Sequence, residues 1–386
     1  AIDYNGRSGA VNFWDAGDPT SASIGVYQFG PDNTLLPEVA YQQGEIVPDG
    51  EANPIDGKPQ DGANDGVFKI GTFLPVTGNL AFLGPPEVAG VKLAIKDIEA
   101  AGGIPGFKKI VLEEGDSGDT STNTGQQTVK RLLPLGIDVL IGAASSGSSL
   151  SVLDQVTNAG VLMISPANTS PELTTAADHG LYWRTAPSDV LQGAFLGSLI
   201  LQDGYTKVAI LSLQDSYGDG LNANVTKAIT EGGGEVVASV VYDPKATDFA
   251  ADVAKIKAAG PEAIVLIGFD ESAQIIQELV KQGIGPNAAS EAHHPLWGAR
   301  RRERPPQGVR PPPPARGDTW GGAGEAPLAN RPSTGPPDGH ELVSTAQKRC
   351  VTPLRCLSGE GYALARVPRY SCTTFGSVAR SRPVPV

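Results

Sequence analysis

The stretch DVLIGAASSGSSLSVLDQVTNAGVLMIS (residues 138–165) decides the fold of this 386-residue chain. It opens with the apolar run DVLIGA (138–143), continues with the amphipathic stretch SSLSVLDQVTNAG (148–160) and closes with the apolar run VLMIS (161–165). Short apolar runs on either side of an amphipathic stretch are typical of parallel strands that are buried on both faces. The stretch therefore predicts a strand, a helix and a second strand.

The same alternation extends in both directions, from Val67 to Asn287. It restarts near residues 186–189, which divides the chain into a first lobe (67–187) and a second lobe (188–287). Alternating apolar strands and helices predict an α/β fold with two doubly wound parallel sheets. In such sheets ligands bind beyond the carboxyl ends of the strands, so functional residues are expected there. The further strands and helices expected are VFKIGTFLP (67–75), a helix from about residue 86, KKIVLEE (108–114), NTGQQTVKRLL (123–133), SDVLQGAFLGSLILQ (188–202), KVAILSL (207–213), GDGLNANVTKAITEGG (218–233), EVVASVVYD (235–243), FAADVAKIKAAG (249–260), AIVLIGF (263–269) and ESAQIIQELVKQG (271–283).

The charge of the chain changes abruptly after residue 290. Residues 1–290 hold 16 Lys and Arg against 35 Asp and Glu, whereas residues 291–386 hold 14 against 7, with Arg almost replacing Lys. The second part includes GARRRERPPQGVRPPPPARG (298–317) and all three Cys. A nucleic-acid arm would need a compatible folded module, and a polyproline docking segment is a second alternative. Because hydrophobic periodicity is lost in residues 288–386, we favour a tail that is disordered or translated out of frame.

Such a tail would leave the second lobe incomplete. We then expect an exposed edge on its sheet, which promotes aggregation, and weak or absent ligand binding by this chain.

The first 66 residues precede the organised part. Residues 1–45 read as a hairpin, with two strands around DAGDP (15–19), and residues 46–66 read as an acidic flexible linker. The chain begins AIDYNG without a signal peptide, so we expect a processed or incomplete start.

Three groups of residues follow predicted strands and form the candidate site. Ser145 and Ser146 lead into a helix, where hydroxyls and free N–H groups suit a carboxylate or phosphate, although serine also simply caps helices. The loop with Ala167, Asn168 and Thr169 presents carbonyls and a hydroxyl, or is an ordinary turn. Tyr217 and Phe269 end strands of the second lobe, where they are either core or the walls of an apolar pocket.

The organised part shows little sign of catalysis. It contains no Cys nucleophile, no His and Cys in metal-ligand spacing, and no phosphate-loop or dinucleotide glycine fingerprint. We therefore expect neither an enzyme nor a bound metal or cofactor.

Four blocks resemble the branched-chain amino-acid-binding proteins of bacterial ABC importers, which have the type I periplasmic-binding fold. The resemblance covers residues 67–287, and it is most specific in the block with GAASS (142–146) and ISPANTSPEL (164–173). The other blocks are GTFLPVTGNLAFLGPPEVAGVKLAIKDIEAAGGI (71–104), LYWRTAPSDVLQG (181–193) and LQDSYGDGL (213–221).

The resemblance implies a role for each candidate residue. Ser146, with Ser145 beside it, and Thr169 are expected to bind the α-carboxylate, while the Ala167 carbonyl and Thr169 meet the ammonium. Tyr217, Phe269 and Leu83 would wall the side-chain pocket. The family's acidic partner of the ammonium and its last strands are not recognisable after Asn287.

The resemblance also implies the context of the protein. An extracytoplasmic monomer is expected, lipid-anchored in the precursor, which delivers its amino acid to the membrane permease of the importer and does not bind nucleic acid. The alternatives are a binder of a small amide or urea-like solute, and a ligand-sensing receptor or regulator. Residues 3–37 resemble the end of the same family, which suggests a tandem remnant or a circular permutation.

Overall fold

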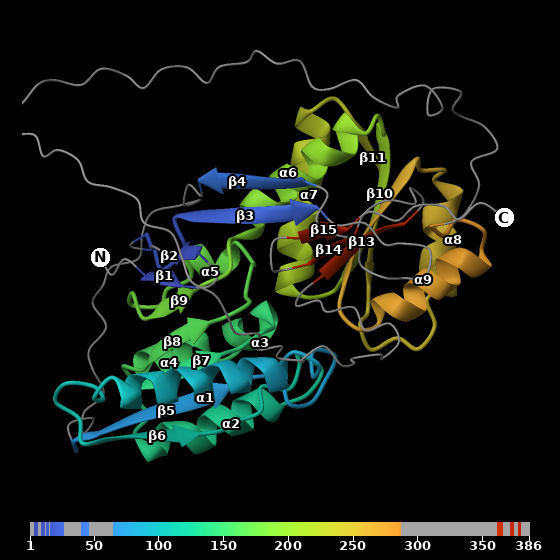
Figure 1. Ribbon diagram of the computed structural model, residues 1–386. Coiled ribbons are helices and arrows are strands. Elements are labelled where there is room, and N and C mark those ends of the chain that lie inside the picture. Colours follow the sequence, from blue (N-terminus) through green and yellow to red (C-terminus); the bar gives the residue numbers. More distant parts are fainter. Residues whose placement is uncertain are drawn as a thin grey trace, which may run out of the picture. The chain divides into compact units, whose positions relative to one another are not determined.

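The computed structural model describes residues 4–6, 9–11, 13–14, 16–26, 40–45, 65–286, 361–365, 371–373 and 377–379. The first lobe contains a five-stranded sheet with the order β6-β5-β7-β8-β9 (Figure 1). All of its neighbouring strands pair in parallel, as predicted. The strands are β5 (Val67–Phe73), β6 (Lys109–Glu113), β7 (Val139–Gly142), β8 (Leu162–Ser165) and β9 (Tyr182–Arg184).

The predicted helices of this lobe occur in the expected order, with one correction, and a short helix at Glu172–Thr175 is additional. They are α1 (Gly84–Ala100), α2 (Thr124–Leu132), the 3-10 turn η1 (Leu133–Leu135), α3 (Ser146–Leu150), α4 (Leu153–Asn158) and α5 (Glu172–Thr175). The single helix expected over 148–160 is wrong, because α3 ends before Ser151 and α4 starts at Leu153. The Ser151 hydroxyl donates to the Ser148 carbonyl at 2.8 Å. Serine hydroxyls compete in this way with helical backbone bonds.

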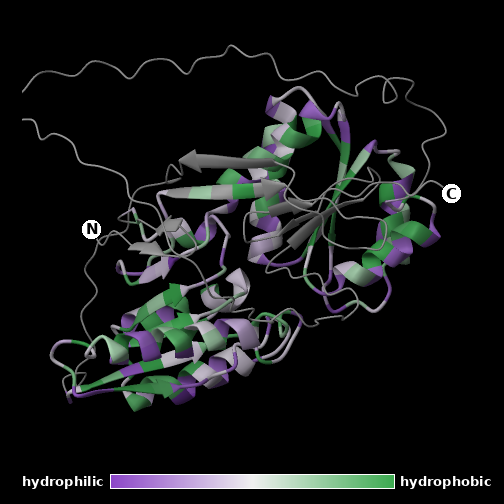
Figure 2. Ribbon diagram, viewed as in Figure 1, coloured by the Kyte–Doolittle hydropathy of each residue, from purple (hydrophilic) through white to green (hydrophobic). Residues whose placement is uncertain are grey.

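One face of the first sheet holds the core of the lobe. Residues from β5, β7 and β8 pack there against α2 and α4, and most are fully buried, among them Phe73, Leu132, Leu140, Val156 and Met163. Figure 2 shows hydrophobic residues running along the strands of both sheets. This packing fixes the carboxyl ends of β7 and β8, from which the candidate residues project.

The second lobe repeats the pattern. Its strands β10 (Lys207–Leu213), β11 (Glu235–Tyr242) and β12 (Ala263–Gly268) pair in parallel with β10 in the middle. The helices are α6 (Asp189–Gln202), α7 (Ser216–Glu231), α8 (Ala250–Ala258) and α9 (Ser272–Lys281). Every residue of β12 is buried, which explains why its sequence is uniformly apolar.

The expected exposed edge of the second sheet is corrected by the structure. Strand β13 (Gly361–Ala365) pairs antiparallel with β12, and β14 (Ser371–Thr373), β15 (Ser377–Ala379), β3 (Ser21–Val26) and β4 (Ala40–Glu45) continue the same sheet. A strand edge offers backbone N–H and C=O groups to any extended segment, so this pairing needs no hydrophobic period. Strands β1 (Tyr4–Gly6) and β2 (Gly9–Val11) form a separate antiparallel pair.

Residues near the amino terminus are fastened to the first lobe by a buried ion pair. Asp18 lies in a turn closed by the Phe13–Pro19 bridge, at the position of the predicted DAGDP turn. Its carboxylate accepts from Arg184 Nε at 2.6 Å, and the two side chains are at most 2% exposed. Phe13 also packs edge-on against Trp183, with ring centroids 5.2 Å apart. This contact is the one that the circular-permutation alternative requires.

We predict that Asp18→Ala lowers the free energy of unfolding by about 3–5 kcal/mol, because it leaves the Arg184 guanidinium buried without its counter-charge. Urea unfolding followed by circular dichroism measures this change. Asp154→Ala, at an exposed position of α4, is the matched control. A loss below about 0.5 kcal/mol, the usual size for a surface substitution, would show that residues 13–24 do not stabilise the lobe.

Candidate functional site

The two serines at the start of α3 have different tasks. Ser145 caps the helix, because its Oγ accepts from the Ser148 N–H at 3.2 Å. The Ser146 Oγ instead accepts from the N–H groups of Thr169 and Ser170, at 3.3 and 3.2 Å. Ser146 therefore ties the loop after β7 to the loop after β8.

The loop after β8 is held by buried hydrogen bonds. Asn168 Nδ2 donates to the Ala144 carbonyl at 2.8 Å, and Asn168 Oδ1 accepts from the Tyr182 hydroxyl at 2.9 Å. These bonds use the side chain of Asn168 within the protein, so it supports the loop. The Thr169 hydroxyl donates to Asp189 Oδ2 at 2.9 Å, and both residues are fully buried.

Arg184 holds the same loop from the other side. Its Nη1 donates to the Ser170 carbonyl at 2.7 Å, and its Nη2 donates to Thr174 Oγ1 at 2.7 Å. The guanidinium thus joins Asp18, the loop after β8 and α5 through one planar group, a geometry that suits arginine. Our sequence reasoning missed this residue, because nothing local in YWRTAP identifies its distant partner.

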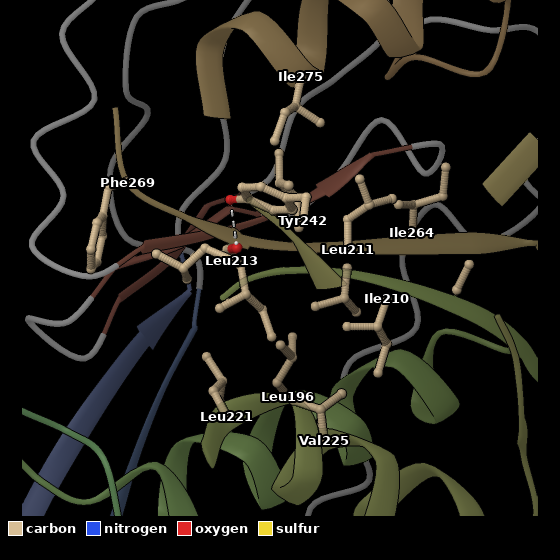
Figure 3. Packing of buried hydrophobic residues seen from close by; sticks show 14 of the residues in the cluster. Leu196, Ile210, Leu211, Leu213, Leu221, Val225, Tyr242, Ile264, Phe269 and Ile275 are labelled. Carbon is tan, nitrogen blue, oxygen red and sulfur yellow. Dashed lines mark hydrogen bonds between the residues drawn. The ribbon is translucent and has the colours of Figure 1, made fainter. Parts of the chain in front are cut away.

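The predicted apolar walls come together in one hydrophobic cluster. Leu83 and Ala167 of the first lobe belong to the same cluster as Tyr217 and Phe269 of the second. The rings of Tyr217 and Phe269 stack with centroids 5.7 Å apart and planes within 7° of parallel. Figure 3 shows Phe269 at one end of the cluster, with Tyr242 bonded through its hydroxyl to the Ile267 carbonyl at 2.9 Å. The three predicted wall residues, Leu83, Tyr217 and Phe269, therefore belong to one apolar cluster.

Three buried carboxylates stand beside these candidates, and the sequence analysis did not single them out. Asp189 adjoins Thr169, Asp215 caps α7 by accepting from the Tyr217 N–H at 3.0 Å, and Glu271 accepts from the Phe269 N–H at 3.0 Å. Burial raises the pKa of each, and that of Asp189 reaches about 7. Within the described part of the chain, Asp189 Oδ1 and Glu271 Oε2 have no hydrogen-bond partner.

The Asp215 carboxylate also lies against α3. A Cβ at position 147 would run into the Asp215 carboxylate and the Thr120 side chain, so a larger residue there would require both side chains to move. A cavity of about 490 Å³ adjoins this contact. Its lining includes Glu172, Asp215 and Asp219. The negative charge around the site favours a cationic group over an anion.

Two further surveys cover the described residues. No group of three or more His, Cys, Asp or Glu there is placed to hold a metal ion. In that same part of the chain, none of the helices combines the length and apolar character needed to cross a membrane.

Two α/β lobes with polar loops and facing apolar walls at their strand ends define a two-lobed solute-binding protein. The sequence profile of the family described as periplasmic binding protein matches residues 67–292, more than half of the chain. The chain belongs to this family.

Individual relatives share this part of the chain. It is 31% identical over 204 residues to the Leu/Ile/Val-binding protein homolog 3 of Brucella melitensis, which covers 52% of this chain and 54% of the relative. LivJ of Streptococcus pneumoniae, a branched-chain amino acid transporter substrate-binding protein solved with isoleucine, is 28% identical, with a TM-score of 0.50 over 56% of this chain and 62% of LivJ. A leucine-binding protein from Thermotoga maritima, 24% identical, shares the fold with a TM-score of 0.51 over 56% and 61% of the two chains. The chain thus spans less than two thirds of each of these relatives.

We predict that Asp189→Asn stabilises the ligand-free protein more at pH 8 than at pH 5. The folded pKa of about 7 exceeds the ordinary value of 3.8. Between these values the native state keeps a proton that the unfolded chain has lost, so stability falls as pH rises and the full penalty persists above pH 7. An asparagine avoids that penalty.

Differential scanning calorimetry at both pH values measures the gain in melting temperature. Asp154→Asn, at an exposed position of the same lobe, is the matched control. An equal gain for Asp189→Asn at the two pH values would contradict the raised pKa.

Proposed function

We propose that this chain captures a branched-chain amino acid between its two lobes, as the solute-binding component of an ABC importer. The proposal rests on one observation, which is that three kinds of chemical group lie together at the strand ends. These are the Ser146 hydroxyl, buried carboxylates beside Thr169 and Phe269, and an apolar wall formed from both lobes. The names of the Brucella and Streptococcus relatives support the same class of solute.

Each part of a zwitterion then has a partner of the right kind. The hydroxyl of Ser146 donates to the α-carboxylate, and the Ala167 carbonyl and the Thr169 hydroxyl accept from the ammonium. Leu83, Tyr217 and Phe269 enclose the aliphatic side chain. Because one methylene changes binding by only about 1–3 kcal/mol, selectivity among leucine, isoleucine and valine is expected to be modest.

The buried acids favour an amine over an amide or a urea. A carboxylate that is buried without a full set of partners is costly, and a ligand cation relieves that cost. A neutral amide brings no charge to offset Asp189 and Glu271. These acids also supply the ammonium partner that could not be recognised after Asn287, so we expect measurable binding by this chain.

The biological setting follows from the family. We propose an extracytoplasmic location, with lipid anchoring of the precursor, and delivery of the amino acid to a membrane permease. The protein would act as a monomer and without catalysis. Titration calorimetry with leucine, isoleucine, valine and isovaleramide tests the solute class. A preference for the amide would contradict the proposal.

We predict that substitutions of the two neighbouring serines differ in effect, because one lowers the affinity for leucine and the other lowers the stability of the protein. Ser146→Ala weakens leucine binding about tenfold or more, because a hydrogen bond to a charged group contributes about 1.5–3 kcal/mol. Ser145→Ala lowers the free energy of unfolding by about 1 kcal/mol through the lost helix cap and leaves leucine affinity within about twofold.

Calorimetry and urea unfolding on the same samples give both quantities. Loss of affinity in Ser145→Ala, with none in Ser146→Ala, would reverse the assignment of the two residues.

We predict that Phe269→Ala weakens leucine binding by about 1.5–3 kcal/mol, the contribution of burying a large apolar side chain. Alanine, whose side chain is too short to need this wall, should keep its affinity within about threefold. Phe107→Ala is the matched control, because Phe107 pairs with Phe68 in the first lobe, outside the site. Equal losses for leucine and alanine would place Phe269 outside the side-chain pocket.

A further inference from the structure

The start of α7 in the second lobe lies against the start of α3 in the first. Asp215, which caps α7, is only 8% exposed. A Cβ placed on Gly147 of α3 would run into the Asp215 carboxylate and into the side chain of Thr120, which lies in the loop after β6. Because Gly147 and Thr120 belong to the first lobe, the carboxylate of Asp215 is a contact between the two lobes.

This carboxylate is only partly satisfied in the contact. Its Oδ1 accepts from the Tyr217 N–H at 3.0 Å and so caps α7. Its Oδ2 is buried and has no hydrogen-bond partner within the described part of the chain. The first-lobe groups beside it, Gly147 and Thr120, carry no charge. A carboxylate that is buried in this way is costly in its ionised form.

The charged groups around Asp215 do not offset its charge. Asp219 follows it on α7, and Glu172 at the start of α5 lines the same cavity, which no Lys, Arg or His among the described residues lines. On the first-lobe side, α3 has no titratable side chain, and the Asp119 carboxylate accepts from backbone N–H groups at 2.9 and 3.1 Å. Burial raises the pKa of Asp215, and the negative charge of Asp219 raises it further.

Separation of the lobes would change the surroundings of this carboxyl. While the lobes are in contact, Asp215 is buried and its neutral form is favoured. Once they separate, water reaches the carboxyl and its pKa returns toward the ordinary value of 3.8. Between that value and the raised one, the contact holds a proton that the separated lobes have lost. The contact is therefore strongest at low pH, weakens as the pH rises through this window and keeps the full penalty above it.

We propose that Asp215 is a proton-sensitive latch between the two lobes, which favours their contact when its carboxyl is neutral and their separation when it is ionised. The cavity of about 490 Å³ beside the contact gives protons access to the carboxyl. The latch is a property of the empty protein and does not depend on the identity of the solute. Where a solute is captured between the lobes, it adds a pH-dependent contribution to their closure.

Hydrogen exchange followed by mass spectrometry tests the latch in the full chain without a solute. The readout is the exchange of residues 143–151, compared between wild type and Asp215→Asn at one pH so that intrinsic rates cancel. Asparagine cannot ionise and caps a helix about as well as aspartate. At pH 8 this segment should exchange at least about tenfold more slowly in Asp215→Asn, and the difference should be at least about threefold smaller at pH 5. Asp219→Asn, at an exposed position of the same helix, is the matched control and should keep the pH dependence of the wild type.

A steric wedge tests the same contact from the first lobe. Gly147→Ala places a Cβ against the Asp215 carboxylate, so it should hold the lobes apart at both pH 5 and pH 8. Adding Asp215→Ser, whose shorter side chain still caps a helix, should restore the protection of residues 143–151. Small-angle X-ray scattering provides an independent readout, because the radius of gyration should be larger for Gly147→Ala than for the double variant. Asp215→Ser also replaces Asp215→Asn if circular dichroism shows that the latter does not fold.

Three results would overturn the latch. Equal exchange in wild type and Asp215→Asn at pH 8 would show that the charge of Asp215 does not oppose the contact. A difference of the same size at pH 5 and pH 8 would show a structural role without a proton. Unchanged exchange in Gly147→Ala at either pH would show that the lobes do not meet at this place in solution. A wild type that binds no amino acid would refute the proposed function only, because none of these measurements uses a solute.

Discussion

The buried ion pair between Arg184 and Asp18 is the constraint on which the site depends. Arg184 is fully buried, and its guanidinium donates to Asp18, to the carbonyls of Asn168 and Ser170, and to Thr174. An uncompensated guanidinium at this depth would be strongly destabilising, so the position of Asp18 and the shape of the loop after β8 are linked. That loop carries Ala167 and Thr169. The segment that precedes the organised part of the sequence is therefore connected physically to the part that would touch a solute.

The hydrophobic periodicity of the sequence was enough to predict the two-lobed α/β architecture, because a buried strand can be identified from a short stretch of sequence. The uniformly apolar run at 263–268 and its counterparts gave the parallel strands and the division into two lobes. Local patterns were less reliable where side chains compete with the backbone, as in the serine-rich segment that separates α3 from α4. They were also silent on the strands of residues 361–379, whose pairing with β12 uses backbone groups that every sequence has.

The candidate site shows the same limit more sharply. The strand-end rule located Ser146, Thr169, Tyr217 and Phe269, and the structure brings them into two linked groups, one polar and one apolar. It did not find the ion pair, whose partners lie 166 positions apart, nor Asp189, Asp215 and Glu271. Each of these acids follows a strand or starts a helix, where an acidic residue is ordinarily a cap. Only their burial beside the candidate residues distinguishes them, and burial of a polar side chain cannot be inferred from a single sequence.

Those buried acids create a tension between stability and binding. In the empty protein, a carboxylate such as Asp189 is buried with an incomplete set of partners, which destabilises the native state and holds its pKa near 7. A cationic solute supplies the missing positive charge. Binding therefore removes the free-energy cost of the buried carboxylate, and this gain contributes to the affinity. The Asp215 carboxylate of the second lobe also lies against Gly147 of α3 in the first lobe. A solute that satisfies carboxylates from both lobes stabilises the state in which the lobes are in contact, and a neutral solute of the same shape does not. Charge, more than shape, would then decide which solutes this site retains.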